Sequence, residues 1–222
     1  MPYDKTVLCL ANSRKMSGRC VAGKEFVGGK AGTWIRPVSA RPTEELSDPD
    51  RNYQNGEDPQ LLDIIKIEML RAAPKTYQRE NHVINEKVYW TKMGRATWGQ
   101  ALTAVDKVRG PLWVNGPPSS YGINDRVPEP VANVQSGSLL LIRPDNLRVA
   151  VAPEWEGQRK VRVLFSLNGE NYKLSLTDHL AEQAYMQGKN GIFPIQNALL
   201  CVSLGELYSG FAYKLAAGLI TP

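Results

Sequence analysis

The first 42 residues carry a net excess of the side chains that suit a polyanionic ligand. Eight Lys and Arg residues stand against two acids, Asp4 and Glu25, so this segment carries +6 (eight minus two) when the whole chain carries +5. Five glycines lie between the expected strands Lys5–Leu10 and Thr33–Val38: Gly18, Gly23, Gly28, Gly29 and Gly32. Glycine lets backbone amides approach phosphates, and Lys and Arg displace counterions. We therefore predict a basic loop that binds a polyanion; the alternative is a solvated surface loop.

A second basic segment, Lys75–Trp98, interleaves five Lys and Arg residues with Tyr and Trp. Aromatic rings stack on unpaired bases while cations hold the phosphates, a combination typical of single-strand binding. Core burial is the alternative, and Trp90 and Trp98 favour it because Trp is highly buried on average. The predicted contacts to nucleic acid are Arg14, Lys15, Arg19, Lys24, Arg36 and Arg41 for phosphates and Trp34, Tyr77 and Tyr89 for bases.

Trp34 and Arg36 share one face of their expected strand, opposite Ile35. This spacing fits either a stacking and phosphate-binding pair or a packed cation–π contact. Both alternatives stay open at the level of the sequence.

A second hypothesis is an enzyme acting on nucleic acid or a nucleotide, with a site assembled from loops. Its polar residues would be Asn12, Ser13, Glu80, Asn81, His82, Asn124, Asp125 and Arg126. The chain has no triphosphate-binding loop, no nucleophile elbow, and cysteines too far apart in sequence for a zinc site. We therefore expect no metal, no cofactor and no turnover of nucleic acid by this chain alone. A third hypothesis is a protein–protein adaptor whose basic loop meets an acidic partner.

Composition sets the broad class of protein. A hydrophobic content of 42% is enough for a packed core, and no apolar run reaches the length of about 18 to 20 residues that a membrane helix needs. Three widely spaced cysteines do not form a disulfide framework, which indicates a reducing compartment. We expect a cytoplasmic protein that does not enter membranes.

Short strands dominate the expected secondary structure. Val161, Val163 and Phe165 share one strand face, with Lys160 and Arg162 on the other, and Asn168-Gly169 predicts the hairpin turn that follows. Further strands are expected at Leu62–Leu70, Val83–Trp90, Ser138–Arg143, Leu147–Ala152, Lys160–Ser166, Asn171–Leu176, Ala198–Leu204 and Phe211–Ile220. Helices are expected at Trp98–Val108, capped by Thr97, and from Thr177 to Gln187.

These elements predict a mainly β protein made of two tandem OB-like small β-barrels with one helix each. The expected domains are residues 1–110 and 135–222. Residues 111–134, which contain five prolines, form either a connector or an ordered functional loop. The match to an OB barrel is loose in the second domain, because its helix follows four strands there and an OB helix follows three.

Several sequence segments resemble the bacterial and phage dual OB-containing domain family. They are, in order, Lys5–Lys15, Gly18–Lys24, Trp34–Ser39, Leu62-Asp63, Tyr77–Asn81, Tyr89-Trp90, Asn124–Val127, Cys201–Glu206 and Tyr213–Leu215. The resemblance implies two tandem OB barrels and a nucleic-acid-binding role, in mobile-element or defence systems that include protein partners. It carries over no catalytic residues. A nucleic-acid-binding module, for single-stranded DNA or RNA, is therefore the leading interpretation.

Overall fold

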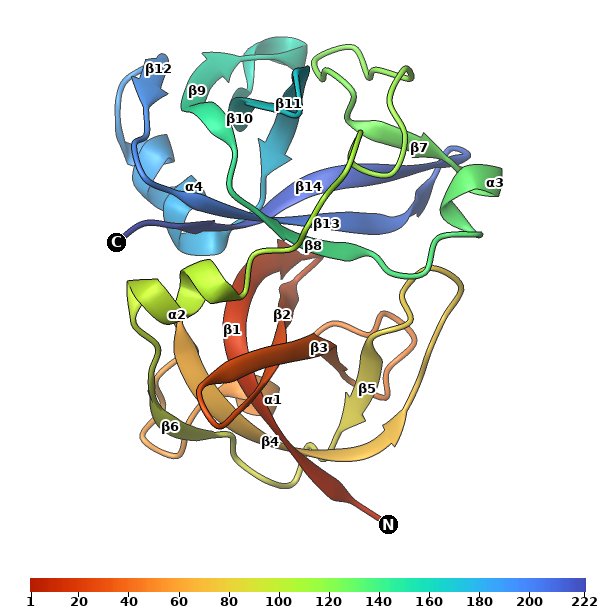
Figure 1. The fold of residues 1–222 in the computed structure, drawn as a ribbon, viewed down its shortest axis with the longest axis vertical. Coiled ribbons are helices and arrows are strands. Elements are labelled where there is room, and N and C mark those ends of the chain that lie inside the picture. The colour runs from red at the N-terminus through yellow and green to blue at the C-terminus, as the bar shows by residue number, and fades with distance from the viewer. The chain divides into compact units, whose positions relative to one another are not determined.

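The computed structural model describes all residues, Met1–Pro222, and divides the chain into two compact units, Met1–Ala104 and Val105–Pro222 (Figure 1). Unit 1 contains β1 (Tyr3–Lys15), β2 (Gly18–Val27), β3 (Lys30–Val38), α1 (Asp48–Arg51), β4 (Asp63–Ala72), β5 (Asn81–Ile84), β6 (Thr91–Arg95) and α2 (Trp98–Thr103). Unit 2 contains β7 (Arg126–Pro128), α3 (Glu129–Ala132), β8 (Leu139–Ile142), β9 (Asp145–Pro153), a 3-10 turn (Trp155–Gly157), β10 (Arg159–Leu167), β11 (Glu170–Leu176), α4 (His179–Gln187), β12 (Gly191–Pro194), β13 (Leu199–Tyr208) and β14 (Phe211–Ile220). The predicted mainly β fold is confirmed. No helix is long and apolar enough to span a membrane.

Unit 1 is a closed five-stranded barrel. Its strands follow the order β1-β2-β3-β5-β4, and β4 pairs back to β1. All of these pairs are antiparallel except β3 with β5, which is parallel. Inward-facing apolar residues such as Val7, Ile35 and Ile67 form its core.

The prediction of a basic loop after Leu10 was wrong, because β1 continues to Lys15 and β2 occupies Gly18–Val27. Two of the five glycines that suggested a loop, Gly18 and Gly23, are needed for close packing inside the sheet, whereas Gly28 and Gly29 form the β2–β3 turn with positive φ. A Cβ at Gly23 would lie 1.9 Å from the carbonyl oxygen of Leu8, and one at Gly18 would lie 2.6 Å from that of Leu46. Glycine here marks a close backbone approach, which a sequence does not distinguish from a turn.

The strand expected over Val83–Trp90 is shorter in the structure and is followed by a turn. β5 ends at Ile84, and Trp90 is buried beyond the turn, where it bridges to Tyr53. β6, which was not expected, then pairs with β4. α2 starts at Trp98 behind the predicted Thr97 cap, whose hydroxyl accepts from the Gln100 amide, but it ends at Thr103 and not at Val108.

Unit 2 has the same strand connectivity once β8 and β9 are taken together. Only Arg143 and Pro144 separate these two strands; β8 pairs with β13 and β9 pairs with β10. They therefore act as two halves of one bent first strand, in the order β8/β9-β10-β11-β14-β13. α4 lies between β11 and β13, the position of an OB helix after the third strand, so the apparent extra strand in the sequence is a bend.

Residues 105–134 belong to unit 2 and pack on its strands. Ile123 bridges to Lys173 of β11, and β7 pairs with β14, so this segment lies between β11 and β14 where the two strands diverge. β11 and β14 pair directly only at Ser175–Leu176. The five prolines thus lie in an ordered segment, and the boundary between the units follows Ala104 where residue 110 had been expected.

Candidate functional site

Three of the predicted nucleic-acid contacts are buried inside unit 1. Lys24 is 6% exposed, donates to the carbonyl of Ala104 at 2.8 Å, and lies over the ring of Trp34. Arg36 is 3% exposed and forms an ion pair with Glu80 at 3.4 Å. Tyr77 is also buried, at 3% exposure. We therefore correct the assignment of Lys24, Arg36 and Tyr77: their cations and ring serve the packing of the barrel and do not reach a ligand at its surface.

The half-buried Trp34 holds Lys24, which matches the packed cation–π alternative. Arg41 is half-exposed and binds Asp50 and the carbonyl of Glu45. Arg41 therefore stabilises the loop that precedes α1. Tyr89 is 60% exposed, lines a cleft of about 420 Å³ in unit 1, and remains a predicted contact.

Arg14, Lys15 and Arg19 come together at the β1–β2 hairpin. Arg14 lies directly opposite Arg19 across the two strands. Burial and, after it, the nearby Arg51 lower the pKa of Arg19, while Asp58 and Asp48 oppose that effect. A phosphate contact at this end of the hairpin therefore remains a prediction.

The polar residues of the enzyme hypothesis fall into two groups, one in each unit. In unit 1, Asn12 donates to the carbonyl of Pro59 at 2.8 Å, and His82 Nδ1 lies 2.7 Å from the hydroxyl of Tyr3. Ser13 and Glu80 bond within the barrel, and Asn81 is fully buried. The buried amide of Asn81 has no hydrogen-bond partner, whereas the other four side chains hold strands and loops together.

The unit 2 group anchors the proline-rich segment. Asn124 accepts from the Gly116 amide at 3.0 Å, and the buried Asp125 accepts from the Ser119 amide at 2.7 Å. Arg126 bonds the carbonyl of Pro118 and lies over the ring of Phe211. No group of three or more His, Cys, Asp or Glu side chains is arranged to hold a metal ion in the structure.

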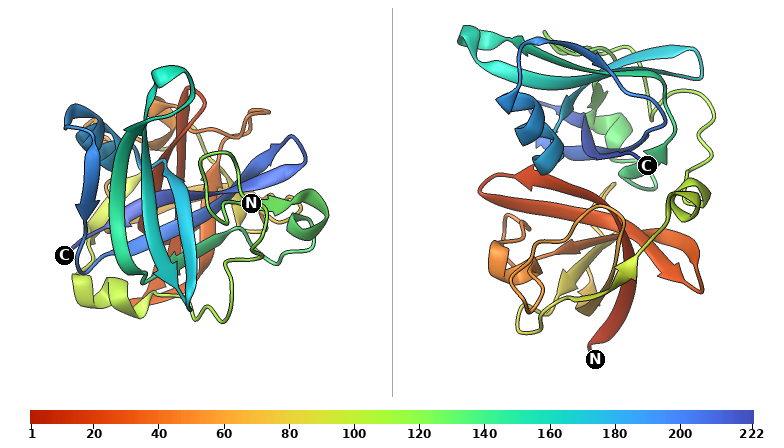
Figure 2. Two further views of the ribbon diagram at one scale, coloured as in Figure 1. Left: turned by 90° about the horizontal axis from the view of Figure 1, so that it is seen from above. Right: turned by 90° about the vertical axis from the view of Figure 1, so that its left-hand side faces the viewer.

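The outer face of β9, β10 and β11 carries a more exposed basic surface, which we call the β9–β11 face. Core residues alternate along β10 with outward residues Lys160, Arg162, Leu164 and Ser166. Strand register sets them in rows: Arg162 lies between Ala150 and Ser175, and Leu164 lies between Arg148 and Lys173. Figure 2, left, looks onto these three strands.

The cations of the β9–β11 face differ in their pairing. Lys160 and Arg148 are exposed and Lys173 is half-buried, and none of the three forms an ion pair. Arg162 instead holds Glu154 through two bonds of 2.5 and 2.8 Å and donates to Ser175. Three cations are therefore open to an anionic ligand, while the fourth is part of the scaffold.

Arg162 also fixes the loop between β9 and β10. Its partner Glu154 begins a tight turn in which the Gln158 carbonyl accepts from the Glu154 amide at 2.9 Å. Trp155 lies on this turn and is 70% exposed. An indole so far out in solvent, on an anchored turn beside cations, has the features of a stacking platform.

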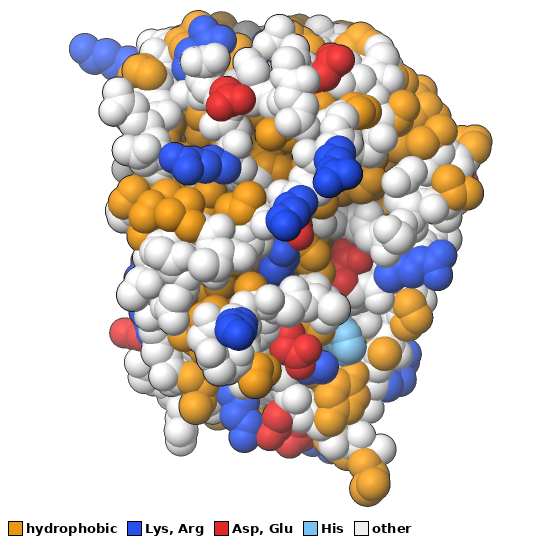
Figure 3. Space-filling view, viewed as in Figure 1, with side chains coloured by type: hydrophobic (Ala, Val, Ile, Leu, Met, Phe, Trp, Pro, Cys, Tyr) orange, Lys and Arg blue, Asp and Glu red, His pale blue; other side chains and the backbone are white.

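Charge elsewhere is more dispersed. On the face drawn in Figure 3, Lys and Arg side chains are spread among acids, apolar atoms and neutral groups and form no single basic field. Of the eight Lys and Arg residues in the first 42, two are buried and three lie at the hairpin end. Of the other three, Lys5 and Arg41 form ion pairs with Glu25 and Asp50, and Lys30 is exposed.

Comparison with protein families assigns the chain. The profile of the Dual OB-containing domain matches residues 5–219, nearly the full length, and the two barrels described above supply the two OB units that its description names. This chain belongs to the Dual OB-containing domain family. No curated protein matches it, and no solved structure matches it.

In OB folds the outer face of the second and third strands, with the loops beside it, commonly holds oligonucleotides. The corresponding strands of this Dual OB-containing domain protein are β2 and β3 in unit 1, and β10 and β11 in unit 2. In unit 1, Lys24 of β2 and Arg36 of β3 are both buried. Unit 2 keeps Lys160 and Lys173 exposed or half-exposed there. In the sequence, the alternation along Lys160–Phe165 places Lys160 and Arg162 opposite the core, and this alternation is the signal that could have pointed to the face.

Proposed function

We propose that the protein binds single-stranded nucleic acid on the β9–β11 face of unit 2. The observation that carries this proposal is the juxtaposition of three cations without ion pairs, Arg148, Lys160 and Lys173, with the exposed ring of Trp155 on the adjoining loop. Cations on the strands would contact phosphates, and the indole would stack on a base.

The dimensions of the face suit an extended strand. From Lys160 to Ser166, the outward residues of β10 cover about 20 Å, given a rise of about 3.3 Å per residue. Single OB units hold about 4 to 16 nucleotides, so one strand running along β10 has room for several phosphate contacts. A duplex is a poorer ligand, because its paired bases leave no ring face for Trp155.

The test is salt-dependent binding of labelled single-stranded oligonucleotides, measured by fluorescence anisotropy. Each phosphate contact contributes about 0.7 to the slope of log affinity against log salt for a single strand. The double variant Lys160→Ala/Lys173→Ala should therefore bind more weakly and lower that slope by about 1.4. Its matched control is Lys30→Ala/Lys87→Ala, which removes two exposed unit 1 lysines that form no ion pair.

We expect the control to keep the slope of the unaltered protein. The proposal would be overturned by absence of binding at low salt, by binding insensitive to salt, or by equal losses in the two double variants.

A further inference from the structure

Unit 2 contains a cleft of about 730 Å³ at the bend between β8 and β9. One wall is the segment from Arg143 to Arg148, and the other is the segment from Pro194 to Ala198, which connects β12 to β13. The Ile195 amide donates to the Leu147 carbonyl at 2.9 Å and so ties the two walls together. The volume lies within the range of about 300 to 1,000 Å³ that is usual for small-ligand sites.

The cleft continues the β9–β11 face. Arg148 belongs to both, and Ser166, the outward residue at the end of β10, lies opposite Asp145 across the strands and also lines the cleft. A strand that runs along β10 from Trp155 therefore reaches the cleft at Ser166.

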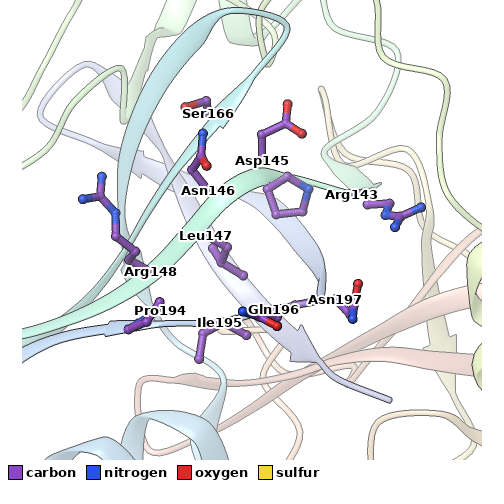
Figure 4. A pocket seen from close by; sticks show the side chains of 12 residues that line it. Arg143, Asp145, Asn146, Leu147, Arg148, Ser166, Pro194, Ile195, Gln196 and Asn197 are labelled. Atoms are coloured by element: carbon purple, nitrogen blue, oxygen red, sulfur yellow. The ribbon is translucent and has the colours of Figure 1, made fainter.

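The side chains around the cleft suit one nucleotide with its base inside. Figure 4 shows Arg143 and Arg148 on opposite sides, with Asn146, Leu147 and Gln196 between them. Neither arginine forms an ion pair. Cations on two sides match a nucleotide within a strand, which has a phosphate before it and another after it.

Side-chain amides supply both donors and acceptors for the edge of a base. Asn146 and Asn197 both adopt left-handed backbone conformations, with φ of 52° and 51°. Asn tolerates this conformation better than most residues. The turns that line the cleft therefore carry two side-chain amides, each with a donor and an acceptor. The half-buried Ile195 provides apolar surface for the ring, whereas Leu147 is 4% exposed and belongs to the core.

Asp145 sets the expected preference among bases. A carboxylate accepts hydrogen bonds and repels a phosphate, so Asp145 favours a base edge with an amino group. Cytosine presents an N4 amino group where thymine presents the O4 acceptor. We propose that this cleft binds one base of the strand and, through Asp145, prefers cytosine to thymine. This inference rests on the proposed function and adds base selection to it.

The test measures the affinity of the full chain for labelled oligo-dC and for labelled oligo-dT, each of about 12 nucleotides. Mildly alkaline conditions keep cytosine unprotonated. We expect the unaltered protein to prefer oligo-dC by about tenfold, the lower range for one good base contact. Asp145→Asn should remove that preference, because an amide offers a donor to thymine O4 as well as an acceptor. Glu170→Gln, the same charge change at the β10–β11 hairpin, is the control and should retain it.

Failure of this inference is distinguishable from failure of the proposed function. Equal affinity for the two oligomers, or a preference for cytosine that survives in Asp145→Asn, overturns the role of the cleft. Salt-dependent binding that still requires Lys160 and Lys173 would then leave the β9–β11 face as the binding surface. If neither oligomer binds at low salt, both proposals fall.

Discussion

The amine of Lys214 donates a hydrogen bond to the backbone carbonyl of Val114 at 2.6 Å, across 100 positions of sequence. Lys214 is 1% exposed, lies over the ring of Tyr172, and also contacts the side-chain oxygen of Asn115 at 3.3 Å. One buried lysine of β14 thus holds the start of the proline-rich segment against the barrel. Burial lowers the pKa of Lys214 to about 7, and the nearby Asp125 opposes that effect only in part.

The lowered pKa of Lys214 predicts that burial of this lysine decreases the free energy of unfolding by an amount that depends on pH. The unfolded chain holds the Lys214 proton up to about pH 10.5, whereas the folded chain releases it at about 7. Between these values the unfolded state binds more protons, so this group's contribution to stability rises with pH; its cost is greatest below 7 and vanishes above 10.5. Lys214→Met lacks this dependence. Urea unfolding of both proteins across that window should show a free-energy difference that changes with pH, and a constant difference would contradict the prediction.

Trp155 is expected to matter for binding and little for folding. Stacking of a base on an aromatic ring is worth about 1 to 3 kcal/mol, so Trp155→Ala should weaken oligonucleotide binding by that amount. Trp155→Phe keeps a ring at the same position and should restore most of the affinity. Because the side chain is exposed, the melting temperature of both variants should stay close to that of the unaltered protein. Unchanged affinity in Trp155→Ala would exclude stacking at this loop.

Arg36 is expected to act on stability and not on binding. Removing one partner of a buried ion pair costs about 3 to 5 kcal/mol, because the remaining charge stays buried. Arg36→Ala should therefore strongly destabilise unit 1 in urea, since Glu80 would lose its partner. The double variant Arg36→Met/Glu80→Leu removes both charges and should recover much of the loss. A stable Arg36→Ala protein with reduced oligonucleotide affinity would instead support a surface role for this arginine.

Two glycines of unit 1 should respond very differently to the same substitution. At Gly23 a Cβ would overlap the backbone of Leu8, whereas at Gly32 the nearest atom would be 3.6 Å away. We expect Gly23→Ala to cost about 3 kcal/mol or more, since overpacking here requires strands β1 and β2 to separate. Gly32→Ala should leave the free energy of unfolding nearly unchanged. Comparable thermal denaturation of the two variants would show that the barrel accommodates the added methyl group.

The β1–β2 hairpin end is the alternative surface at which phosphate contacts are predicted. If Arg14 and Lys15 contact phosphates, Arg14→Ala/Lys15→Ala should lower the salt slope by about 1.4, as expected for two single-strand contacts. If the β9–β11 face is sufficient, this variant should bind like the unaltered protein. The anisotropy titration used for Lys160 and Lys173 measures both surfaces on one scale.

Local patterns in the sequence determined the class of fold. Alternation along Lys160–Phe165, the Asn168-Gly169 turn, and the Thr97 cap all depend on residues a few positions apart, and each was confirmed. Such signals are short-range because strand periodicity and capping are short-range. They were sufficient for a mainly β protein of two OB-like units.

Only the tertiary structure decided which charges are buried and which are open to solvent. Lys24 and Arg36 look like surface cations in a basic segment, yet contacts with Ala104 and Glu80, distant in sequence, bury them. Lys160 lies outside the two basic segments singled out in the sequence, yet the alternation of β10 puts it on the same open face as Arg148 and Lys173, which flank Leu164 farther along the strand. Burial of a cation depends on which distant groups pack over it, and that information arises only when strands far apart in the chain pair into a barrel.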